Sequence, residues 1–150
     1  PAAGRLVRLR PVNATRSATF YFALCSPAPV AEPLIVLQSY GAASEDPAER
    51  SRVVSVGFPS VVQRSYAPEG QELAAVTVMG ELPEEAWVRS EVERVLGVGC
   101  SRWRHLRTYD IPFHQPAQMP GHRPGSPCEV DGVLVCGDHC ADPTLDGAMR

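Results

Sequence analysis

The sequence contains no lysine, and its 14 basic side chains are all arginines distributed over 150 residues. A short local concentration is the stretch RWRHLR at residues 102–107. The formal net charge is −3 at neutral pH. Because binding to a phosphate backbone requires concentrated positive charge, this composition argues against nucleic acid as the main partner.

Long apolar segments are also missing, since no stretch approaches the roughly 18 apolar residues of a membrane-spanning helix. With 44% hydrophobic residues, the chain can still fill the core of one domain. We therefore predict a globular domain without a transmembrane segment. The chain opens at Pro1 with neither a methionine nor a basic-then-apolar leader, and we expect it to be a piece of a longer protein.

The cysteines lack the pattern of a disulfide framework, because there are five of them at irregular spacing. A reducing compartment is the simpler interpretation. The tightest group offers ligand types that zinc prefers but lacks the paired spacing of a zinc knuckle. It consists of Cys128, Cys136, His139 and Cys140. We therefore predict no metal site and expect small buried thiols in this group.

Apolar runs rich in β-branched and aromatic residues predict four strands, at 18–25, 33–39, 52–58 and 73–80. The connection between the first two is Pro-rich and too short for a helical crossover. It therefore predicts an antiparallel return and a meander.

One helix is predicted over residues 83–97, with a proline suited to its first position and Gly97 suited to its end. Its apolar positions fall on one face, which includes Trp87. Glu85 and Arg89 form an i,i+4 pair on the outside. Trp87 is therefore interpreted as a core residue and not as part of a site.

Residues 102–111 alternate with the period of a β-strand. One predicted face of this strand carries an unusually polar row: Trp103, His105, Arg107, Tyr109 and Ile111. We expect this face to line a cavity. A Pro-, Gly- and His-rich stretch at 112–127 predicts a long irregular connection, and residues 132–138 predict a last buried strand.

The chain closes with VLVCGDHCADPTLDGAMR at 133–150, which predicts a strand, a polar loop and the start of a helix. A helix N-terminus offers unpaired N–H groups to an electron-rich ligand, here from Thr144 to Ala148. The small residues Gly147 and Ala148 would let a planar ligand approach the backbone, and the Asp138 carboxylate could accept hydrogen bonds from sugar-type hydroxyls. The alternative is an ordinary strand, turn and capped helix without a ligand.

This closing segment resembles the flavin-contacting end of the FAD-dependent amine oxidase and phytoene desaturase superfamily. There, an apolar strand, Gly-Asp or Gly-Glu, a loop and a small-residue helix follow one another. WRHLRTYDIPFHQPAQ at 103–118 is similar to the family segment with an aromatic residue, Ile-Pro and Pro-Ala-Gln. SYAPEGQELAAVTVMG at 65–80 resembles a turn and strand of the family. The resemblance covers most of the chain, is most specific at 103–118 and 132–150, and is weak before residue 50.

The resemblance implies an α+β fold, with an antiparallel substrate-domain sheet and a helix. The terminal strand–helix unit of a two-lobed FAD-binding (Rossmann-like) α/β domain would follow. Residues 1–118 would form a partial substrate-binding domain, and residues 119–150 would return into the FAD-binding domain. Gly137 and Asp138 would lie by the ribityl and pyrophosphate part of FAD, and the Leu145 N–H would face the flavin pyrimidine oxygen. The predicted FAD-binding residues are Gly137, Asp138, Thr144, Leu145 and Ala148.

The function implied by the resemblance is that of a flavin-dependent oxidoreductase, which transfers hydride from an amine, a polyene or another apolar substrate to FAD. Trp103, Tyr109 and His114 are the predicted substrate-lining residues. No catalytic residue is assigned, because in this superfamily the protein mainly orients the substrate. A non-catalytic α+β binding domain is the alternative, whereas a Ser-His-Asp hydrolase has no nucleophile elbow to support it.

The sequence departs from the family by lacking GxGxxG after an early strand. We therefore expect the rest of the polypeptide to be needed to complete the FAD site. The 150-residue chain alone is expected to bind FAD poorly and to be inactive. The sequence does not identify the substrate, the compartment or the oligomeric state, although the desaturase branch would be compatible with a plastid.

Overall fold

The structure is a computed structural model that describes residues 13–37, 52–118 and 128–149. The chain divides into two compact units. The sheet unit comprises Arg16–Ile111, and the terminal unit comprises Pro1–Thr15 with Pro112–Arg150. The described residues form an α+β fold with a mostly antiparallel sheet and few helices, as predicted. No helix in these ranges is long and apolar enough to cross a membrane.

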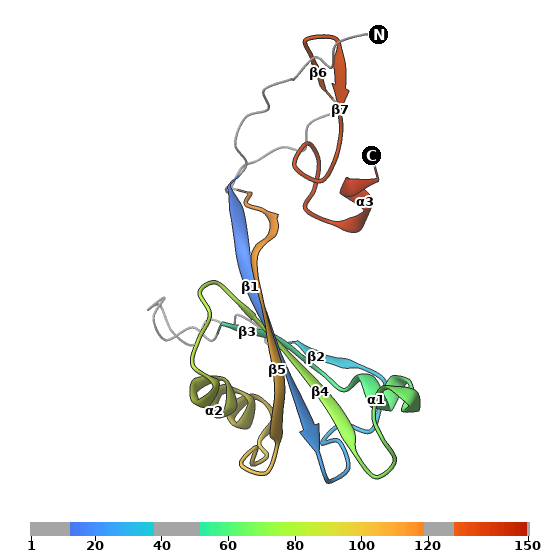
Figure 1. Cartoon of the computed structure of the whole chain (residues 1–150), viewed down its shortest axis with the longest axis vertical. Helices are drawn as coiled ribbons and strands as arrows, with labels where there is room; N and C mark the ends of the chain where they lie inside the picture. Colours follow the sequence, from blue (N-terminus) through green and yellow to red (C-terminus); the bar gives the residue numbers. More distant parts are fainter. Residues whose placement is uncertain (1–12, 38–51, 119–127, 150) are drawn as a thin grey trace. The chain divides into compact units, whose positions relative to one another are not determined.

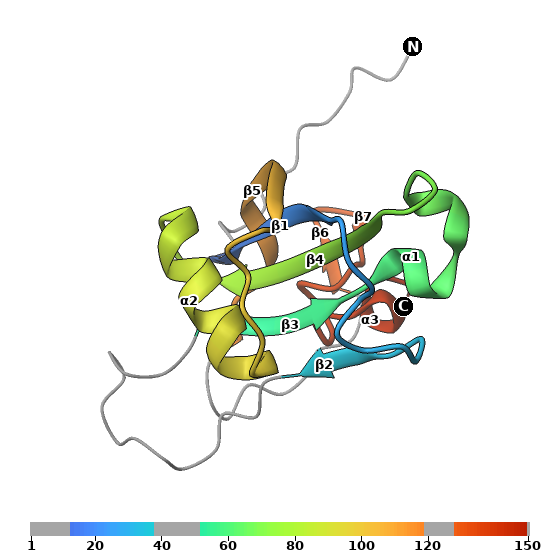
Figure 2. The same cartoon turned by 90° about the horizontal axis from the view of Figure 1, so that it is seen from below.

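The main sheet has five strands in the order β2-β3-β4-β1-β5 (Figures 1 and 2). Each of the pairs β2–β3, β3–β4 and β4–β1 is antiparallel. All four predicted strands are present, and the fifth is the one predicted at 102–111. The strands are β1 (Ala14–Leu24), β2 (Ile35–Leu37), β3 (Val53–Gly57), β4 (Glu72–Met79) and β5 (Arg104–Pro116).

The predicted meander is wrong at its first step, because β1 does not pair with β2. Instead β1 lies between β4 and β5, and only β2, β3 and β4 follow one another as a meander. β1 thus has both of its edges paired, which satisfies its backbone N–H and C=O groups inside the sheet. The Pro-rich link after Leu24 leads to the opposite edge of the sheet.

Alternate residues of the central strands form the core of the sheet unit. On β4, Val76 and Val78 are at most 1% exposed, whereas Thr77 between them is only half-buried. Phe20 and Phe22 of β1 are buried on the same side. Cross-strand partners share a face, and the pairing of Phe20 with Val76 therefore makes this side the core face.

The helix α2 (Glu85–Leu96) covers the core face (Figure 2). Its Val88 and Val92 are at most 1% exposed and belong to the core cluster. Gly97 ends the helix at φ 68°, and its N–H donates to the Glu93 carbonyl at 2.8 Å. Trp87 packs half-buried against the core, as predicted.

Two short helical segments, α1 (Pro59–Val62) and the 3₁₀ turn η2 (Arg64–Tyr66), connect β3 to β4 and were not predicted. The predicted pair of Glu85 and Arg89 is confirmed, with 2.7 Å between Oε1 and Nη2.

In the terminal unit, β6 (Cys128–Val130) and β7 (Val133–Val135) form an antiparallel hairpin, and α3 (Leu145–Ala148) follows. The strand predicted at 132–138 is therefore shorter than expected, and within the described residues it pairs with β6. The prediction that it is buried is wrong, because Val133 is 39% and Leu134 is 79% exposed. The irregular connection predicted at 112–127 is wrong for its first residues, because β5 continues to Pro116. Residues 119–127 lie outside the described residues.

Candidate functional site

The polar row predicted on β5 is divided between the two faces of the sheet. The Trp103 ring lies 6.0 Å from that of Phe22, and the His105 ring lies 5.5 Å from the same phenyl group. Tyr109 instead meets Tyr21 edge-on at 5.8 Å. Because Tyr21 and Phe22 are neighbours on β1, they point to opposite faces. Trp103 and His105 thus lie on the core face, and Tyr109 lies on the other.

A local irregularity in β5 explains this division. His105 Nε2 lies 2.9 Å from Thr108 Oγ1, within hydrogen-bonding distance. In a regular strand, residues three apart point to opposite faces and cannot meet in this way. The predicted alternation therefore fails between His105 and Tyr109.

The face opposite α2 is built from rows of cross-strand partners, and we call it the open face. Ile35 pairs with Gly57, Gly57 with Ala75, and Ala75 with Tyr21. The ring contact between Tyr21 and Tyr109 continues this row onto β5. Since direct partners share a face, an apolar row crosses all five strands.

A second row runs beside the first and carries hydroxyl groups. Leu37 pairs with Ser55, Ser55 with Thr77, and Thr77 with Thr19. The middle of the open face thus has small side chains, with larger apolar ones on either side. This arrangement leaves a shallow floor between apolar walls.

Two hollows open on this face, of about 640 Å³ over β2–β4 and about 570 Å³ over β4, β1 and β5. Both volumes fall within the range of small-molecule sites. They adjoin at the β1–β4 pair, because Thr19 and Tyr21 line the second hollow while their partners Thr77 and Ala75 line the first. The open face can therefore accommodate one extended apolar ligand.

Charged side chains occur at the β5 end of the open face. Asp110 accepts two hydrogen bonds from Arg16, at 3.1 Å from Nε and 2.6 Å from Nη2. These bonds, together with the charge of Arg16, hold the pKa of Asp110 below its usual range. Arg107 lies over the Tyr109 ring, with 4.9 Å from Cζ to the ring centroid. Among the described residues, no carboxylate lies within ion-pairing distance of Arg107.

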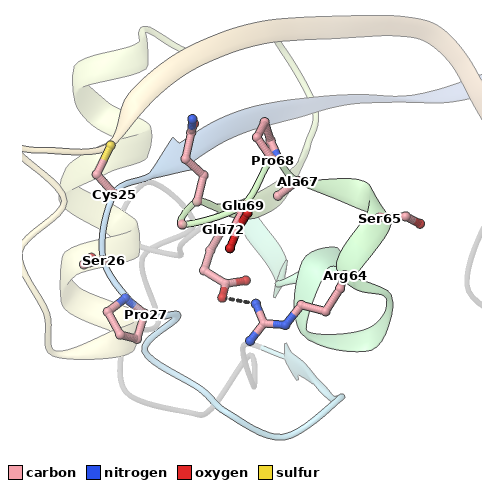
Figure 3. Close-up of a pocket in the computed structure, with 11 residues that line it drawn as sticks. Cys25, Ser26, Pro27, Arg64, Ser65, Ala67, Pro68, Glu69 and Glu72 are labelled. Carbon is pink, nitrogen blue, oxygen red and sulfur yellow. Dashed lines mark hydrogen bonds and ion pairs between the residues drawn. The ribbon is translucent and has the colours of Figure 1, made fainter.

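A third hollow, of about 650 Å³, surrounds a charged pair (Figure 3). Glu72 is 9% exposed and accepts hydrogen bonds from Ser60 Oγ, at 2.5 Å, and from the Arg64 guanidinium. The Leu73 N–H donates to the same Ser60 oxygen at 2.8 Å. The hydrogen bond from Ser60, followed by that from Arg64, lowers the pKa of Glu72. Glu72 is thus an ionised carboxylate that joins η2 to β4, and it is poorly suited to acid–base catalysis.

The buried thiol of Cys100 is equally poor as a nucleophile. Burial, reinforced by the charge of Glu93, raises its pKa to about 11. Cys25 and Cys136 are exposed, so the expectation of a buried thiol is wrong for Cys136. The side chain of Cys128 is not among those that the structure describes. Within the described ranges, no three His, Cys, Asp or Glu side chains gather as a metal site would require.

The predicted FAD-binding residues lie in the terminal unit. Thr144 caps α3 by accepting a hydrogen bond from the Gly147 N–H at 3.0 Å. Leu145 is 81% exposed, whereas Asp138 is half-buried. The role predicted for Gly147 requires correction, because a β-carbon there would clash with the Asp142 carbonyl oxygen. The chain's own backbone, and not a planar ligand, occupies the space beside Gly147.

Two glutamines that the sequence analysis did not select hold this segment in place. Gln115 Nε2 donates to the Pro143 carbonyl at 2.7 Å, and Gln118 Nε2 donates to the Ala141 carbonyl at 2.8 Å. The two segments with the most specific resemblance, 103–118 and 132–150, are therefore joined by hydrogen bonds. The Pro-Ala-Gln pattern was the signal that could have identified Gln118.

Of the three predicted substrate-lining residues, Trp103 and Tyr109 lie on opposite faces of the sheet. Trp103 is 6% exposed within the core, and Tyr109 is 48% exposed on the open face. His114 is exposed on the part of β5 that belongs to the terminal unit.

Comparison with solved structures relates this fold to the crystal structure of an oxidoreductase from Methanosarcina mazei. The TM-score is 0.57 at 16% sequence identity, and the match covers 91% of this chain and 32% of that chain. At this level of sequence identity, the structural similarity shows a shared fold and nothing more specific. The present chain spans about a third of the length of that protein. No protein-family model matches the chain, and no curated protein matches its sequence.

Proposed function

We propose that this chain is part of a FAD-dependent oxidoreductase that transfers hydride from an apolar substrate, such as an amine or a polyene, to the flavin. The observation that carries the proposal is the pair of hydrogen bonds from Gln115 and Gln118 to the loop before α3. They join the two segments that most specifically resemble the flavoprotein superfamily. The fold shared with an oxidoreductase supports the same conclusion.

The residues of the terminal unit fit one edge of FAD. The Asp138 carboxylate can accept hydrogen bonds from the ribityl hydroxyls. The cap from Thr144 fixes the first turn of α3, and the main chain at Leu145 would then face the flavin pyrimidine ring. Bound FAD would supply the hydride acceptor, while the protein binds and orients the substrate. The remaining contacts to FAD would come from the rest of the polypeptide.

The open face of the sheet unit suits the substrate. Its apolar row would bury an apolar molecule, at about 25 cal/mol for each Å² removed from water. Its hydroxyl row offers hydrogen bonds that would orient a polar substituent.

The second candidate is a non-catalytic α+β binding domain, which the same open face favours. Such a domain would bind an apolar ligand without a flavin. Flavin content distinguishes the two candidates, because a binding domain has no need of FAD.

The test is to purify the longer gene product that contains this chain and to record its absorbance spectrum. We expect the bands of oxidised flavin in the wild type and weaker FAD retention in Asp138→Ala. Asp142→Ala is the matched control, since the described contacts of Asp142 are through its backbone. The 150-residue chain incubated with FAD and then separated from unbound FAD by gel filtration is expected to be colourless. A colourless longer protein would refute the oxidoreductase proposal and leave the binding domain.

A further inference from the structure

We propose that the two hollows on the open face form one groove for an elongated apolar carboxylate, with Arg107 binding the carboxylate group. This inference rests on the proposed function, because it specifies the substrate class of the same face. It also narrows that class, since it favours an acid over an amine.

The length of the groove follows from the sheet. The apolar row runs from Ile35 on β2 to Tyr109 on β5 and crosses four interstrand spacings, or about 19 Å. Over β3 and β4 the row consists of Gly57, which has no side chain, and Ala75, and both leave room above the backbone, while Tyr21 continues the row on β1 beside Tyr109. Larger apolar groups stand at the ends, where Ile35 is 63% and Tyr109 is 48% exposed. This shape suits an extended acyl or polyene chain that lies across the strands.

The two ends of the groove differ in charge. Among the described residues that line the hollow over β2–β4, the Tyr66 phenol is the one ionisable group, and this hollow therefore suits the apolar tail. The hollow near β5 contains Arg107 and Asp110. Arg16 neutralises Asp110 through two hydrogen bonds. Arg107 has no such partner among the described residues, and this end of the groove therefore carries a net positive charge.

Arg107 is also positioned for an anion. Its guanidinium is held 4.9 Å from the centroid of the Tyr109 ring, which restricts the side chain while leaving its N–H groups free for a ligand. A planar guanidinium matches the geometry of a carboxylate. A substrate amine would instead meet a like charge at this end, because the nearby Asp110 carboxylate is already engaged.

The experiment measures the fluorescence of cis-parinaric acid, a polyene carboxylate, and of its methyl ester as each is titrated into the 150-residue chain. We expect the acid to bind about tenfold more tightly than the ester, as loss of a charge-assisted hydrogen bond would predict. Arg107→Gln should abolish this difference and leave the affinity for the ester unchanged. Arg104→Gln, an exposed arginine that lines neither hollow, is the charge control.

A second pair of variants tests the place of binding. Ala75→Trp fills the floor of the groove and should weaken binding of both probes at least tenfold. Ala86→Trp makes the same change on the exposed side of α2 and should leave both affinities unchanged. Circular dichroism of each variant separates loss of binding from loss of folding, and if Ala75→Trp does not fold, Ala75→Leu replaces it.

Three results would overturn the proposal of a groove. They are equal binding of the acid and the ester, unchanged affinities in Arg107→Gln, and full binding of the probes by the folded Ala75 variant. Absence of binding would overturn it as well. None of these results affects the flavin content of the longer protein, and failure of this inference is therefore distinguishable from failure of the proposed function.

Discussion

The sheet unit and the terminal unit differ in the interactions that stabilise each of them internally. The sheet unit has a core that includes Phe20, Phe22, Val76 and Val88, all at most 2% exposed. The buried residues in the described part of the terminal unit are Pro116, Ala141 and Gly147, none of which has a large side chain. Its loop and short helix are held by side-chain hydrogen bonds to the backbone.

This difference indicates how the two units relate to a ligand. Apolar burial is the main source of stability in a small domain, so the sheet unit can provide a preformed surface by itself. The terminal unit orders its backbone with few buried groups, and under the proposed function FAD and the rest of the polypeptide would stabilise it further. Four substitutions test this comparison.

The largest effect is expected from Phe22→Ala. Phe22 is 1% exposed, contacts the rings of Trp103 and His105, and lies beneath the Arg89 guanidinium. Truncating such a phenylalanine costs about 3–5 kcal/mol of unfolding free energy. Urea denaturation followed by tryptophan fluorescence measures this loss. Phe113→Ala, at a position 59% exposed, is the control and should change stability by less than about 0.5 kcal/mol. Equal effects of the two would contradict the assigned core.

Glu72→Gln should be the next most destabilising, by about 1–3 kcal/mol at neutral pH, because it weakens charge-assisted bonds from Ser60 and Arg64. The pKa of Glu72 is lowered in the folded state. Its stabilising contribution is therefore complete above the ordinary pKa of about 4.5 and is lost as the pH falls through the lowered value. The stability gap between wild type and Glu72→Gln should shrink below that pH. Glu69→Gln is the control, and a gap independent of pH would contradict the assignment.

Gly97→Ala should destabilise the helix that covers the core by about 1 kcal/mol, because φ is 68° at this C-cap. Gly99→Ala should be nearly neutral, since a β-carbon at Gly99 meets no atom within 4 Å and no left-handed φ is required there. Thermal denaturation of both variants provides the comparison. A neutral Gly97→Ala would show that the helix does not end as described.

Gln118→Ala should have the smallest effect on global stability, below about 0.5 kcal/mol, because the sheet unit does not depend on it. Amide hydrogen exchange should nevertheless accelerate around Ala141, where the amide of Gln118 donates to the carbonyl. A loss of stability as large as that of Phe22→Ala would show that the two units do not differ as described.

Local patterns predicted most elements of the sheet unit. Alternation identified β4 within one residue at each end, and the helix signals placed α2 and its final Gly97. The position of β1 between β4 and β5 could not be predicted, because strand order depends on contacts between residues far apart in the sequence.

The candidate site was less predictable, for two physical reasons. The contact of His105 with Thr108 breaks the alternation of β5, and Tyr109 therefore faces away from Trp103. Gln115 and Gln118 act on carbonyls 28 and 23 residues away, which no local pattern reveals. The FAD-binding roles of Asp138 and Leu145 stay predictions from the resemblance.

The most direct test of the account is hydrogen exchange in the longer protein with and without FAD. The account predicts that FAD slows amide exchange in residues 137–148 and leaves the core strand β4 and the helix α2 unchanged. Unchanged exchange in residues 137–148 on addition of FAD would contradict it.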